Sequence, residues 1–458
     1  MITDTIAAVS TGMTPSGIGK VRLSGTSAIE IVDKLYRSPK GKKSLKKVSS
    51  HTINYGYIYD GDQMIDEVLV LVMKAPNSYT TEDVVEIDCH GGVVVMRKIL
   101  EAVIKYGARP AEPGEFTKRA FLNGRIDLSQ AEAVIDIIHS KNEYALNSSV
   151  QQLHGNLLNQ IKEVRKSVIG SIAFIEAALD DPEHIHADDY GTTLKKQINE
   201  NLSILEKLLQ SCDDGRLLKE GIKTVILGKP NAGKSSLLNY LSGEERAIVT
   251  DIAGTTRDTL EEIIQVGGIM LNVIDTAGIR DTSDTVEKIG VEKAKKYASE
   301  ADLIIYIADG STSMDENDLE ILELIQNKKT IILLNKIDLN LKTTKSEIEK
   351  KTKHPVIEVS VKEQRGLEVF SELIKKMFFE GKLTFNDQIY ITNVRHKAAI
   401  QEAVDSLKMV LQSIEDDMPE DFFSIDLMNA YEALGRIMGE SVGEDLINTI
   451  FSDFCMGK

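Results

Sequence analysis

The sequence has little cysteine, no long apolar run and no basic surplus. Its three cysteines, Cys89, Cys212 and Cys455, are too scattered for a disulfide framework or a zinc-binding spacing. No apolar run reaches the roughly 18 residues of a membrane-spanning helix, so no membrane span is expected. Residues 1–4 show no basic segment leading into an apolar one, which argues against a secretory signal. We therefore expect a cytoplasmic protein.

The net charge of −17 is unevenly distributed along the chain. Residues 1–120 carry 16 Lys and Arg against 14 Asp and Glu, so the acidic excess lies in the remaining residues. A protein with a broad nucleic-acid-binding face would show a basic balance instead. Charge alone therefore gives no reason to expect a nucleic-acid partner, although composition does not report local clusters.

The secondary-structure patterns of the 458 residues predict several domains. Residues 1–118 mix short strand patterns with helical ones, which is typical of an α+β N-terminal domain. Residues 119–218 and 379–458 are helical in pattern. Between them, residues 219–378 alternate strands with helices, as in a doubly wound sheet. We predict a multidomain α/β protein whose doubly wound domain is inserted into a discontinuous helical domain.

The inserted domain contains the motif Gly228-Lys229-Pro230-Asn231-Ala232-Gly233-Lys234-Ser235, between an apolar strand pattern and a helix pattern. This order is that of a phosphate-binding P-loop. The glycines let backbone N–H groups surround a phosphate, and the helix start adds its positive dipole end. Lys234 is expected to reach the β- and γ-phosphates, and the Ser235 hydroxyl to coordinate Mg²⁺. Taken alone, the motif could also be a plain glycine-rich turn before a helix.

Further polar segments follow the predicted strands. Asp275-Thr276-Ala277-Gly278 offers a carboxylate for Mg²⁺ through water and a glycine N–H for the γ-phosphate. Asn335-Lys336-Ile337-Asp338 offers a carboxylate that can accept both N–H donors of guanine. Thr256 is a candidate second Mg²⁺ ligand, and Ser360-Val361-Lys362 could contact the base through its backbone. Each motif is weak alone, but their order resembles the GTPase domains of translation-factor-type proteins.

The motifs together predict a P-loop GTPase domain that binds GTP through residues of five segments. The expected GTP-binding residues are Asn231, Ala232, Gly233, Lys234, Ser235, Ser236, Thr250, Asp251, Ile252, Ala253, Gly254, Thr255, Thr256, Asp275, Thr276, Ala277, Gly278, Asn335, Lys336, Asp338, Ser360, Val361 and Lys362.

Ile279 stands where many regulatory GTPases carry a glutamine that orients the attacking water. An apolar side chain cannot do this. Water positioning and charge neutralisation must therefore come from another acid in the loop, a partner or a cation. Sequence chemistry does not choose among the charged residues of the loop, which are Arg280, Asp281, Asp284 and Glu287.

Segments outside these motifs resemble the MnmE (TrmE) family of tRNA-modifying GTPases. They are Tyr79-Thr80-Thr81-Glu82-Asp83-Val84-Val85-Glu86, His90-Gly91-Gly92, Pro113-Gly114-Glu115-Phe116, Arg119-Ala120-Phe121-Leu122-Asn123, Asp127-Leu128-Ser129-Gln130-Ala131-Glu132-Ala133 and Phe454-Cys455-Met456-Gly457-Lys458. They span nearly the full chain. The resemblance implies a folate-binding, dimerising N-terminal domain, a discontinuous helical domain and an inserted GTPase domain.

The resemblance also implies a function. Family members act with an FAD-containing MnmG-type flavoprotein, here expected as a heterotetramer, on the wobble uridine of certain tRNAs. They add an aminomethyl or carboxymethylaminomethyl group at C5, with 5-formyl- or 5,10-methylene-tetrahydrofolate as the proposed one-carbon source. A homodimer through the N-terminal domain is expected. The alternative is a regulatory GTPase, such as a ribosome-assembly factor, whose extra domains serve only for docking.

Individual roles follow from the same resemblance. Glu287 would orient the attacking water through a second water, acting with Lys234 in catalysis, and K⁺ would supply the charge of an arginine finger. The implied K⁺ ligands are Asn231, Thr250, Ile252 and Thr255, and the Mg²⁺ ligands are Ser235 and Thr256. The implied folate contacts are Arg22, Glu86, Arg125 and Lys458.

Arg22 and Glu86 also have a simpler interpretation, and Cys455 has two possible ones. Without the resemblance, Arg22 and Glu86 would be interpreted as a strand ion pair. Cys455 would be interpreted as a small apolar side chain that anchors the tail rather than as a reactive thiol. The terminal Cys-x-Gly-Lys pattern instead favours a functional tail near the folate.

Overall fold

The computed structural model describes residues 4–41, 43–181, 184, 190–244, 262–274, 297–379, 390–416, 418–452, 454, 455 and 457. The chain forms two compact units. The first contains Met1–Ile135, Leu153–Leu158 and Tyr431–Lys458, and the second contains Asp136–Gln152 and Asn159–Ala430. Among the described residues, no helix has both the length and the apolar character needed to cross a bilayer.

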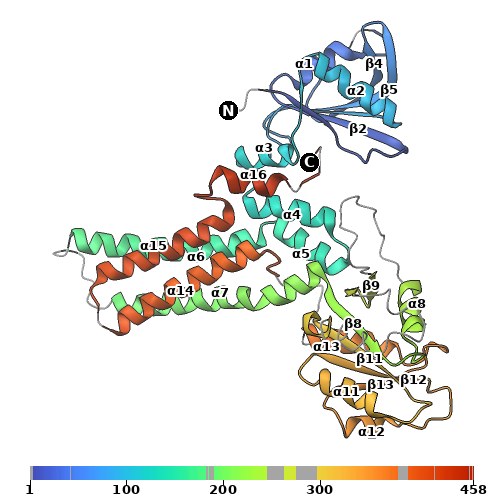
Figure 1. Ribbon diagram of the computed structural model, residues 1–458. Coiled ribbons are helices and arrows are strands. Elements are labelled where there is room, and N and C mark those ends of the chain that lie inside the picture. The colour runs from blue at the N-terminus through green and yellow to red at the C-terminus, as the bar shows by residue number, and fades with distance from the viewer. Residues whose placement is uncertain are drawn as a thin grey trace. The chain divides into compact units, whose positions relative to one another are not determined.

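A sheet with α1 and α2 forms the N-terminal domain (Figure 1). The sheet has seven strands in the order β3-β4-β5-β6-β2-β1-β7. Neighbouring strands are antiparallel except β1 and β7, which are parallel. Alternate residues of β5, such as Val68, Val70 and Val72, are buried with α1 and α2. The elements are β1 (Ile6–Val9), β2 (Ser16–Ser24), α1 (Ala28–Leu35), β3 (Tyr36–Arg37), η1 (Leu45–Lys47), β4 (Thr52–Asp60), β5 (Gln63–Met73), β6 (Val84–Gly91), α2 (Val93–Lys105) and β7 (Arg109–Pro110).

Helices from both ends of the chain complete the first unit. α3 (Glu115–Leu122) and the first turns of α4 (Leu128–His139) pack with α16 (Glu444–Ser452). Their shared core includes Ala120, Leu128 and Phe451, all of them buried. The C-terminal residues therefore belong to the same unit as the N-terminal domain.

Long helices form one part of the second unit (Figure 1). α7 is joined to α14 by ion pairs of 2.8 Å, Lys195–Glu415 and Lys408–Glu206, and to α6 by a hydrogen bond from Asn201. The helices of this part are α5 (Glu143–Leu153), α6 (Asn156–Asp180), α7 (Tyr190–Glu220), α14 (Val394–Glu415) and α15 (Glu420–Met438), whose last residues belong to the first unit.

A six-stranded sheet forms the other part, in the order β13-β12-β11-β8-β10-β9. Its strands are parallel except β9, which forms an antiparallel hairpin with β10. Every residue of β12 is buried, as expected for a strand covered on both faces. The elements are β8 (Ile222–Gly228), α8 (Lys234–Glu244), β9 (Glu262–Val266), β10 (Ile269–Val273), β11 (Leu303–Asp309), α11 (Glu316–Leu324), β12 (Thr330–Asn335), α12 (Lys345–Glu349), β13 (Val356–Glu358) and α13 (Glu368–Phe379).

The expected fold class is confirmed: an N-terminal domain with a mixed sheet and helices, a helical domain and a doubly wound domain. The domain boundaries 1–118, 119–218, 219–378 and 379–458 stay predictions. In the doubly wound sheet, the carboxyl ends of β8, β11 and β12 lie at one edge, because these strands are adjacent and parallel. This edge carries the P-loop motif.

Candidate functional site

The P-loop connects β8 to α8, so the predicted order of strand, loop and helix is confirmed. Asn231 and Gly233 have φ angles of 62° and 111°, in the left-handed region. A Cβ on Gly233 would lie 2.2 Å from the side-chain nitrogen of Asn335, so only glycine allows this approach. The tight backbone turn precedes a helix N-terminus, which is the arrangement that receives a phosphate.

Lys234 lies in the first turn of α8, and its side chain bends back over the loop. Its Nζ donates hydrogen bonds of 2.7 Å each to the carbonyl oxygens of Gly228 and Lys229. Burial lowers the pKa of Lys234. A phosphate near this ammonium would favour its charged form and raise the pKa again. The geometry therefore suits Lys234 for neutralising phosphate charge.

The residues expected at the base end of the nucleotide also meet. Asn335 donates a hydrogen bond of 2.8 Å to the carbonyl of Ala232 and accepts one of 3.1 Å from the N–H of Val361. The Ser360 hydroxyl donates to Asp338 at 2.7 Å, and this bond lowers the pKa of Asp338. The structure thus brings together the P-loop, residues 335–338 and residues 360–362.

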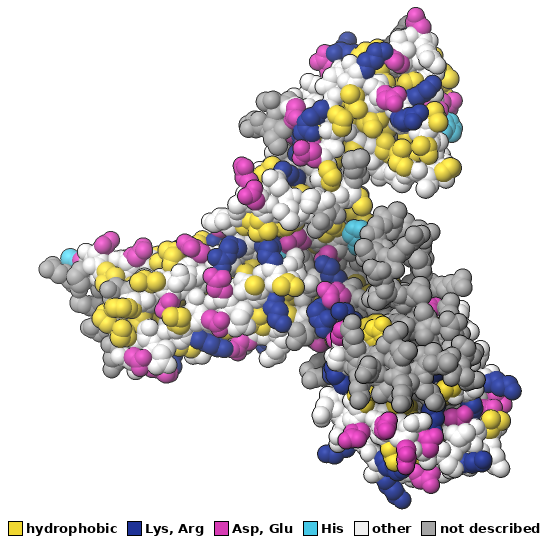
Figure 2. All heavy atoms as spheres, viewed as in Figure 1, with side chains coloured by type: hydrophobic (Ala, Val, Ile, Leu, Met, Phe, Trp, Pro, Cys, Tyr) yellow, Lys and Arg dark blue, Asp and Glu magenta, His cyan; other side chains and the backbone are white. Residues whose placement is uncertain are grey.

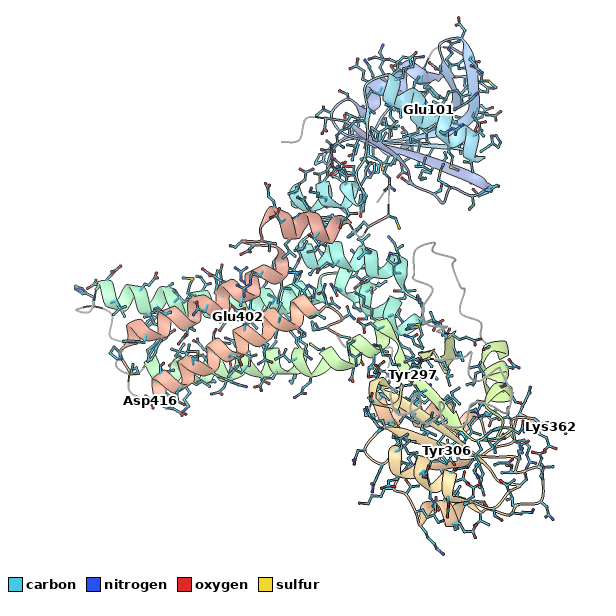
Figure 3. The ribbon with its side chains drawn as sticks, viewed as in Figure 1. Glu101, Tyr297, Tyr306, Lys362, Glu402 and Asp416 are labelled. Atoms are coloured by element: carbon cyan, nitrogen blue, oxygen red, sulfur yellow. The ribbon has the colours of Figure 1, made fainter. Side chains whose placement is uncertain are left out.

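Lys336 and Lys362, which lie in the motifs expected at the base, differ in their surroundings. Lys336 forms a 2.5 Å ion pair with Asp309, the last residue of β11. Lys362 is exposed at the margin of the GTPase domain (Figure 3). Sequence reasoning did not single out Asp309. Its position was the available signal, since it ends the strand next to the one that ends at Asn335.

Ser235 and Ser236 follow Lys234 in α8. Some of the expected nucleotide, cation and folate residues lie outside the part of the chain that the structure describes. They are Thr250, Asp251, Ile252, Ala253, Gly254, Thr255, Thr256, Asp275, Thr276, Ala277, Gly278, Glu287 and Lys458.

A second polar cluster lies on the sheet of the N-terminal domain. Arg22 of β2 stands opposite Glu86 of β6, and its Nε donates to the carboxylate at 2.8 Å. Lys20, on the same face of β2, also pairs with Glu86. Arg22 further donates a hydrogen bond of 3.2 Å to the carbonyl of Gly457, which places Gly457 beside this cluster. Sequence reasoning missed Lys20, although the two-residue period of a strand places it beside Arg22.

Aromatic rings lie around Arg22. The guanidinium carbon lies 5.6 Å from the ring centres of both Tyr79 and Phe116, at cation–π distance. The guanidinium carbon of Arg125 lies 4.5 Å from the same Tyr79 ring. The structure therefore brings Arg22 and Arg125 together at one tyrosine, with Glu86 paired to Arg22. Tyr79 and Phe116 belong to segments that resemble the MnmE family, but no role was predicted for them.

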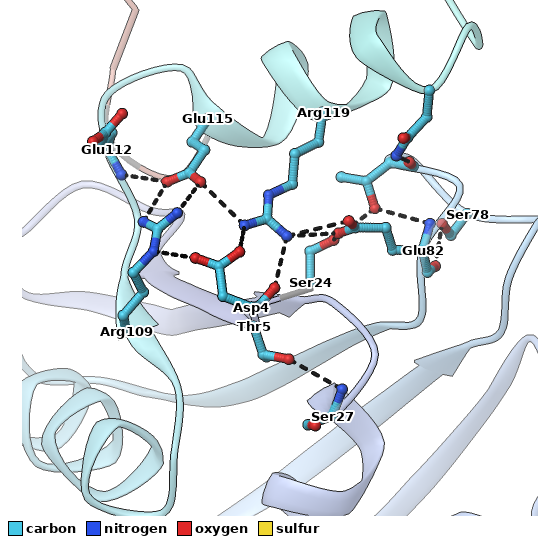
Figure 4. Close-up of polar contacts among 12 residues, drawn as sticks. Asp4, Thr5, Ser24, Ser27, Ser78, Glu82, Arg109, Glu112, Glu115 and Arg119 are labelled. Carbon is cyan, nitrogen blue, oxygen red and sulfur yellow. Dashed lines mark hydrogen bonds and ion pairs between the residues drawn. The ribbon is translucent and has the colours of Figure 1, made fainter. Parts of the chain in front are cut away.

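A network of ion pairs around the buried Arg119 side chain holds the segments that carry these rings (Figure 4). The side chain of Arg119, on α3, is fully buried. It contacts Asp4 at 2.8 Å, and Glu82 and Glu115 at 3.1 Å. Arg109 adds contacts to Asp4 and Glu115. Because Phe116 is on α3 and Tyr79 precedes Glu82 by three residues, this network fixes the surroundings of Arg22.

Cys455 is exposed, so its interpretation as a buried anchor of the tail is wrong. Phe451 and Phe454, which are 1% and 4% exposed, take that role instead. Apolar packing by two aromatic rings fixes the end of the chain more strongly than one thiol would.

Comparisons with known proteins agree with the geometry. The sequence profile of the TrmE N-terminus, described as that of a GTP-binding protein, matches residues 5–125, and that of the MnmE helical domain matches residues 128–455. A protein from Lachnoclostridium phytofermentans described as tRNA modification GTPase MnmE is 58% identical over 458 residues, covering all of both chains. One from Acetivibrio thermocellus with the same description is 50% identical and covers 99% of each chain.

The solved G domain of the T. maritima FeoB iron transporter is 30% identical, covering 35% of this chain and 97% of that one, with a TM-score of 0.26. The family itself is shown by the two profiles and the full-length relatives. The chain is a GTP hydrolase involved in tRNA modification, and it belongs to the MnmE family of tRNA modification GTPases.

Proposed function

We propose that the protein couples GTP hydrolysis to the addition of an aminomethyl or carboxymethylaminomethyl group at C5 of the wobble uridine in tRNA. The one-carbon unit comes from 5-formyl- or 5,10-methylene-tetrahydrofolate, and an FAD-containing MnmG-type protein is the partner in a heterotetramer. The observation that carries the proposal is the cluster of Arg22 and Glu86 between aromatic rings, at the C-terminal tail.

The cluster has the chemistry that a folate requires. A pterin ring presents adjacent N–H donors, which a carboxylate accepts, while the rest of the folate offers an aromatic ring and carboxylates. Burial raises the pKa of Glu86, but Lys20 and Arg22 outweigh this effect, so its pKa lies below the ordinary value and it remains a charged acceptor. Tyr79 offers a ring for stacking, and Arg22, Arg125 and Lys458 offer positive charge.

The folate assignment predicts that Glu86→Gln weakens binding of 5-formyltetrahydrofolate by about tenfold or more, since a hydrogen bond to a charged group is replaced by a neutral one. Titration of the full-length protein measures this. Glu101→Gln is the matched control, because Glu101 is exposed on α2. Equal folate affinity in both variants would remove Glu86 from the site.

The wobble-uridine function itself is tested in cells. Mass spectrometry of tRNA from cells that lack the protein should show wobble uridines without the C5 group. If wobble uridines carry the C5 group as often as in the parent strain, the proposal is contradicted. That result would favour a regulatory GTPase that acts in ribosome assembly.

The cation sites follow from donor chemistry. Ser235 and Thr256 would hold Mg²⁺, and Asn231, Thr250, Ile252 and Thr255 would hold K⁺. Hydroxyl, amide and carbonyl oxygens suit both hard cations, and Asn231 is exposed on the left-handed turn of the P-loop. Bound cations neutralise charge that develops on the phosphates. Lys234 holds the phosphates, and Glu287 orients the attacking water through a second water.

The K⁺ site predicts that GTP hydrolysis in KCl exceeds that in NaCl of equal ionic strength by about tenfold or more, because charge neutralisation in phosphoryl transfer has effects of this size and larger. Steady-state phosphate release measures it. Asn231→Ala should remove most of the difference between the salts. Equal rates of the unaltered protein in KCl and NaCl would rule out the site.

The N-terminal sheet supports homodimerisation. Ile53, Tyr55 and Leu69 alternate along β4 and β5 with buried residues and are 43–64% exposed. They lie on the sheet face opposite the one buried with α1 and α2, and Ile18 and Met64 are also exposed. Apolar surface of this kind is uncommon on a monomer unless another protein covers it. A second copy of the chain is the proposed occupant.

Contact with tRNA is proposed to be shared with the flavoprotein. On the face shown in Figure 2, basic and acidic side chains are interspersed along the long helices rather than gathered by sign. A shared site would lessen the need for a broad basic face on this chain.

We also propose a cytoplasmic location, which the free cysteines Cys89, Cys212 and Cys455 support.

A further inference from the structure

Lys229, the second residue of the P-loop, joins this loop to α11. Its Nζ lies 2.5 Å from a carboxylate oxygen of Asp318 and 2.7 Å from one of Asp315. Its own carbonyl accepts one of the two hydrogen bonds of Lys234. One residue thus contacts the phosphate-binding lysine through its backbone and a neighbouring helix through its side chain. The nucleotide motifs assign no role to this side chain.

The two carboxylates that form ion pairs with Lys229 are themselves held in place by hydrogen bonds. Asp315 and Asp318 form a capping box at the start of α11, in which each side chain accepts from the backbone N–H of the other. The hydroxyl of Tyr306, on β11, donates to the second oxygen of Asp318 at 2.6 Å. Tyr306 lies inside the GTPase domain and is 1% exposed (Figure 3). Asp318 is therefore a rigid acceptor on the core of the domain.

This ion pair differs from an ordinary surface pair. An exposed pair adds little, because water solvates both charges well. The side chain of Asp318 is only 8% exposed, so removal of the lysine would leave a buried carboxylate without its cation. Burial lowers the pKa of Lys229, but Asp315 and Asp318 outweigh this effect and the pKa lies above its ordinary value. Lys229 is thus charged, and its side chain is fixed by the two aspartates.

We propose that Lys229 is a positioning residue for nucleotide binding, which fixes the first half of the P-loop to α11. This half contains the two carbonyls that hold Lys234 and leads into the left-handed turn at Asn231. The second half is held separately by Asn335, at the carbonyl of Ala232. A loop fixed at both halves loses less conformational freedom when the nucleotide binds. Lys229 therefore affects nucleotide binding indirectly, because it fixes the conformation of the P-loop.

Lys229→Met tests the proposal in the full-length protein. The KM for GTP and the Kd for GDP should each rise about tenfold, while kcat changes less than about threefold, because order in the loop serves substrate and transition state alike. Steady-state kinetics and titration with a fluorescent GDP measure these values. Lys229→Arg should restore most of the affinity, since its guanidinium can bridge both carboxylates.

Controls separate positioning from folding. Lys345→Met removes a lysine from an exposed pair with Glu349 on α12 and should leave both constants unchanged. Tyr306→Phe removes only the hydroxyl that fixes Asp318 and should raise the Kd for GDP about two- to threefold, less than the loss of the cation. Wild-type GDP affinity in Lys229→Met, or an equal loss in Lys345→Met, would overturn the proposal. Should Lys229→Met fail to fold, unchanged GDP affinity in Tyr306→Phe would overturn it.

Discussion

Asp338→Asn is expected to lower the affinity for GTP by at least about 100-fold. Guanine presents two adjacent N–H donors that a carboxylate accepts together, and each hydrogen bond to a charged group contributes about 1.5–3 kcal/mol. Asp338 is suited to this role, because the hydroxyl of Ser360 orients it and lowers its pKa, which keeps it ionised at neutral pH. Titration with fluorescent guanine nucleotides measures the loss.

The same variant should prefer xanthosine triphosphate to GTP. Xanthine carries a carbonyl where guanine carries its exocyclic amine, and an asparagine amide can donate to that carbonyl while it accepts from the ring N–H. Glu363→Gln is the matched control, because Glu363 is exposed in the loop that follows Ser360. It should keep the preference for GTP. An Asp338→Asn protein with unchanged nucleotide preference would show that Asp338 does not accept from the base.

Local patterns predicted the nucleotide domain well, because its central strands are short, continuous apolar runs. β11 and β12 are buried along almost their whole length, and β8 is buried at Thr224, Val225 and Ile226, so these sequences stand out from the helices between them. The ends of these strands then located the P-loop and Asn335. The bond between Lys229 and Asp318 could not be predicted in this way. It joins residues 89 positions apart, at a helix start that carries no nucleotide motif.

In the N-terminal domain, too, contacts between residues distant in the sequence could not be predicted from local patterns. The pattern of β2 indicated a strand with Arg22 on it, but β7 has only two residues and gives no pattern. The resemblance to MnmE, rather than spacing, selected Arg22 and Glu86. The ion network around Arg119 depends on contacts to Asp4, 115 residues earlier in the sequence, and such pairs follow from the folded topology alone.

Arg119→Met is expected to destabilise the N-terminal domain by about 3–5 kcal/mol, the cost of removing one partner from a buried ion pair. Asp4, Glu82 and Glu115 would be left around an apolar side chain, and Arg109 would still pair with Asp4 and Glu115. Hydrogen exchange of amides in α3 and β6 of the full-length protein measures this loss locally. A local measurement is required because a chain of several domains has no single unfolding free energy.

The network also predicts a dependence on pH. Burial raises the pKa of Glu115, but Arg109 and Arg119 outweigh it, so the folded value lies below the ordinary one. The pKa of Asp4 is lowered by the same two arginines, again against burial. Groups with lowered folded pKa values stabilise the fold above their unfolded values, near pH 4, and lose that effect as the pH falls through the folded values. Protection of α3 should therefore decrease below about pH 4.

Arg97→Met separates this network from an ordinary ion pair. Arg97 lies on α2 of the same domain and pairs with Glu101 at 3.7 Å, with both side chains about two-thirds exposed. Its replacement should change local stability by less than about 0.5 kcal/mol. Arg119→Met should also show a weaker decrease of protection with acid, because Asp4 and Glu115 regain pKa values closer to the ordinary ones. Equal exchange rates in the two variants would mean that the buried network stabilises the domain no more than a surface pair does.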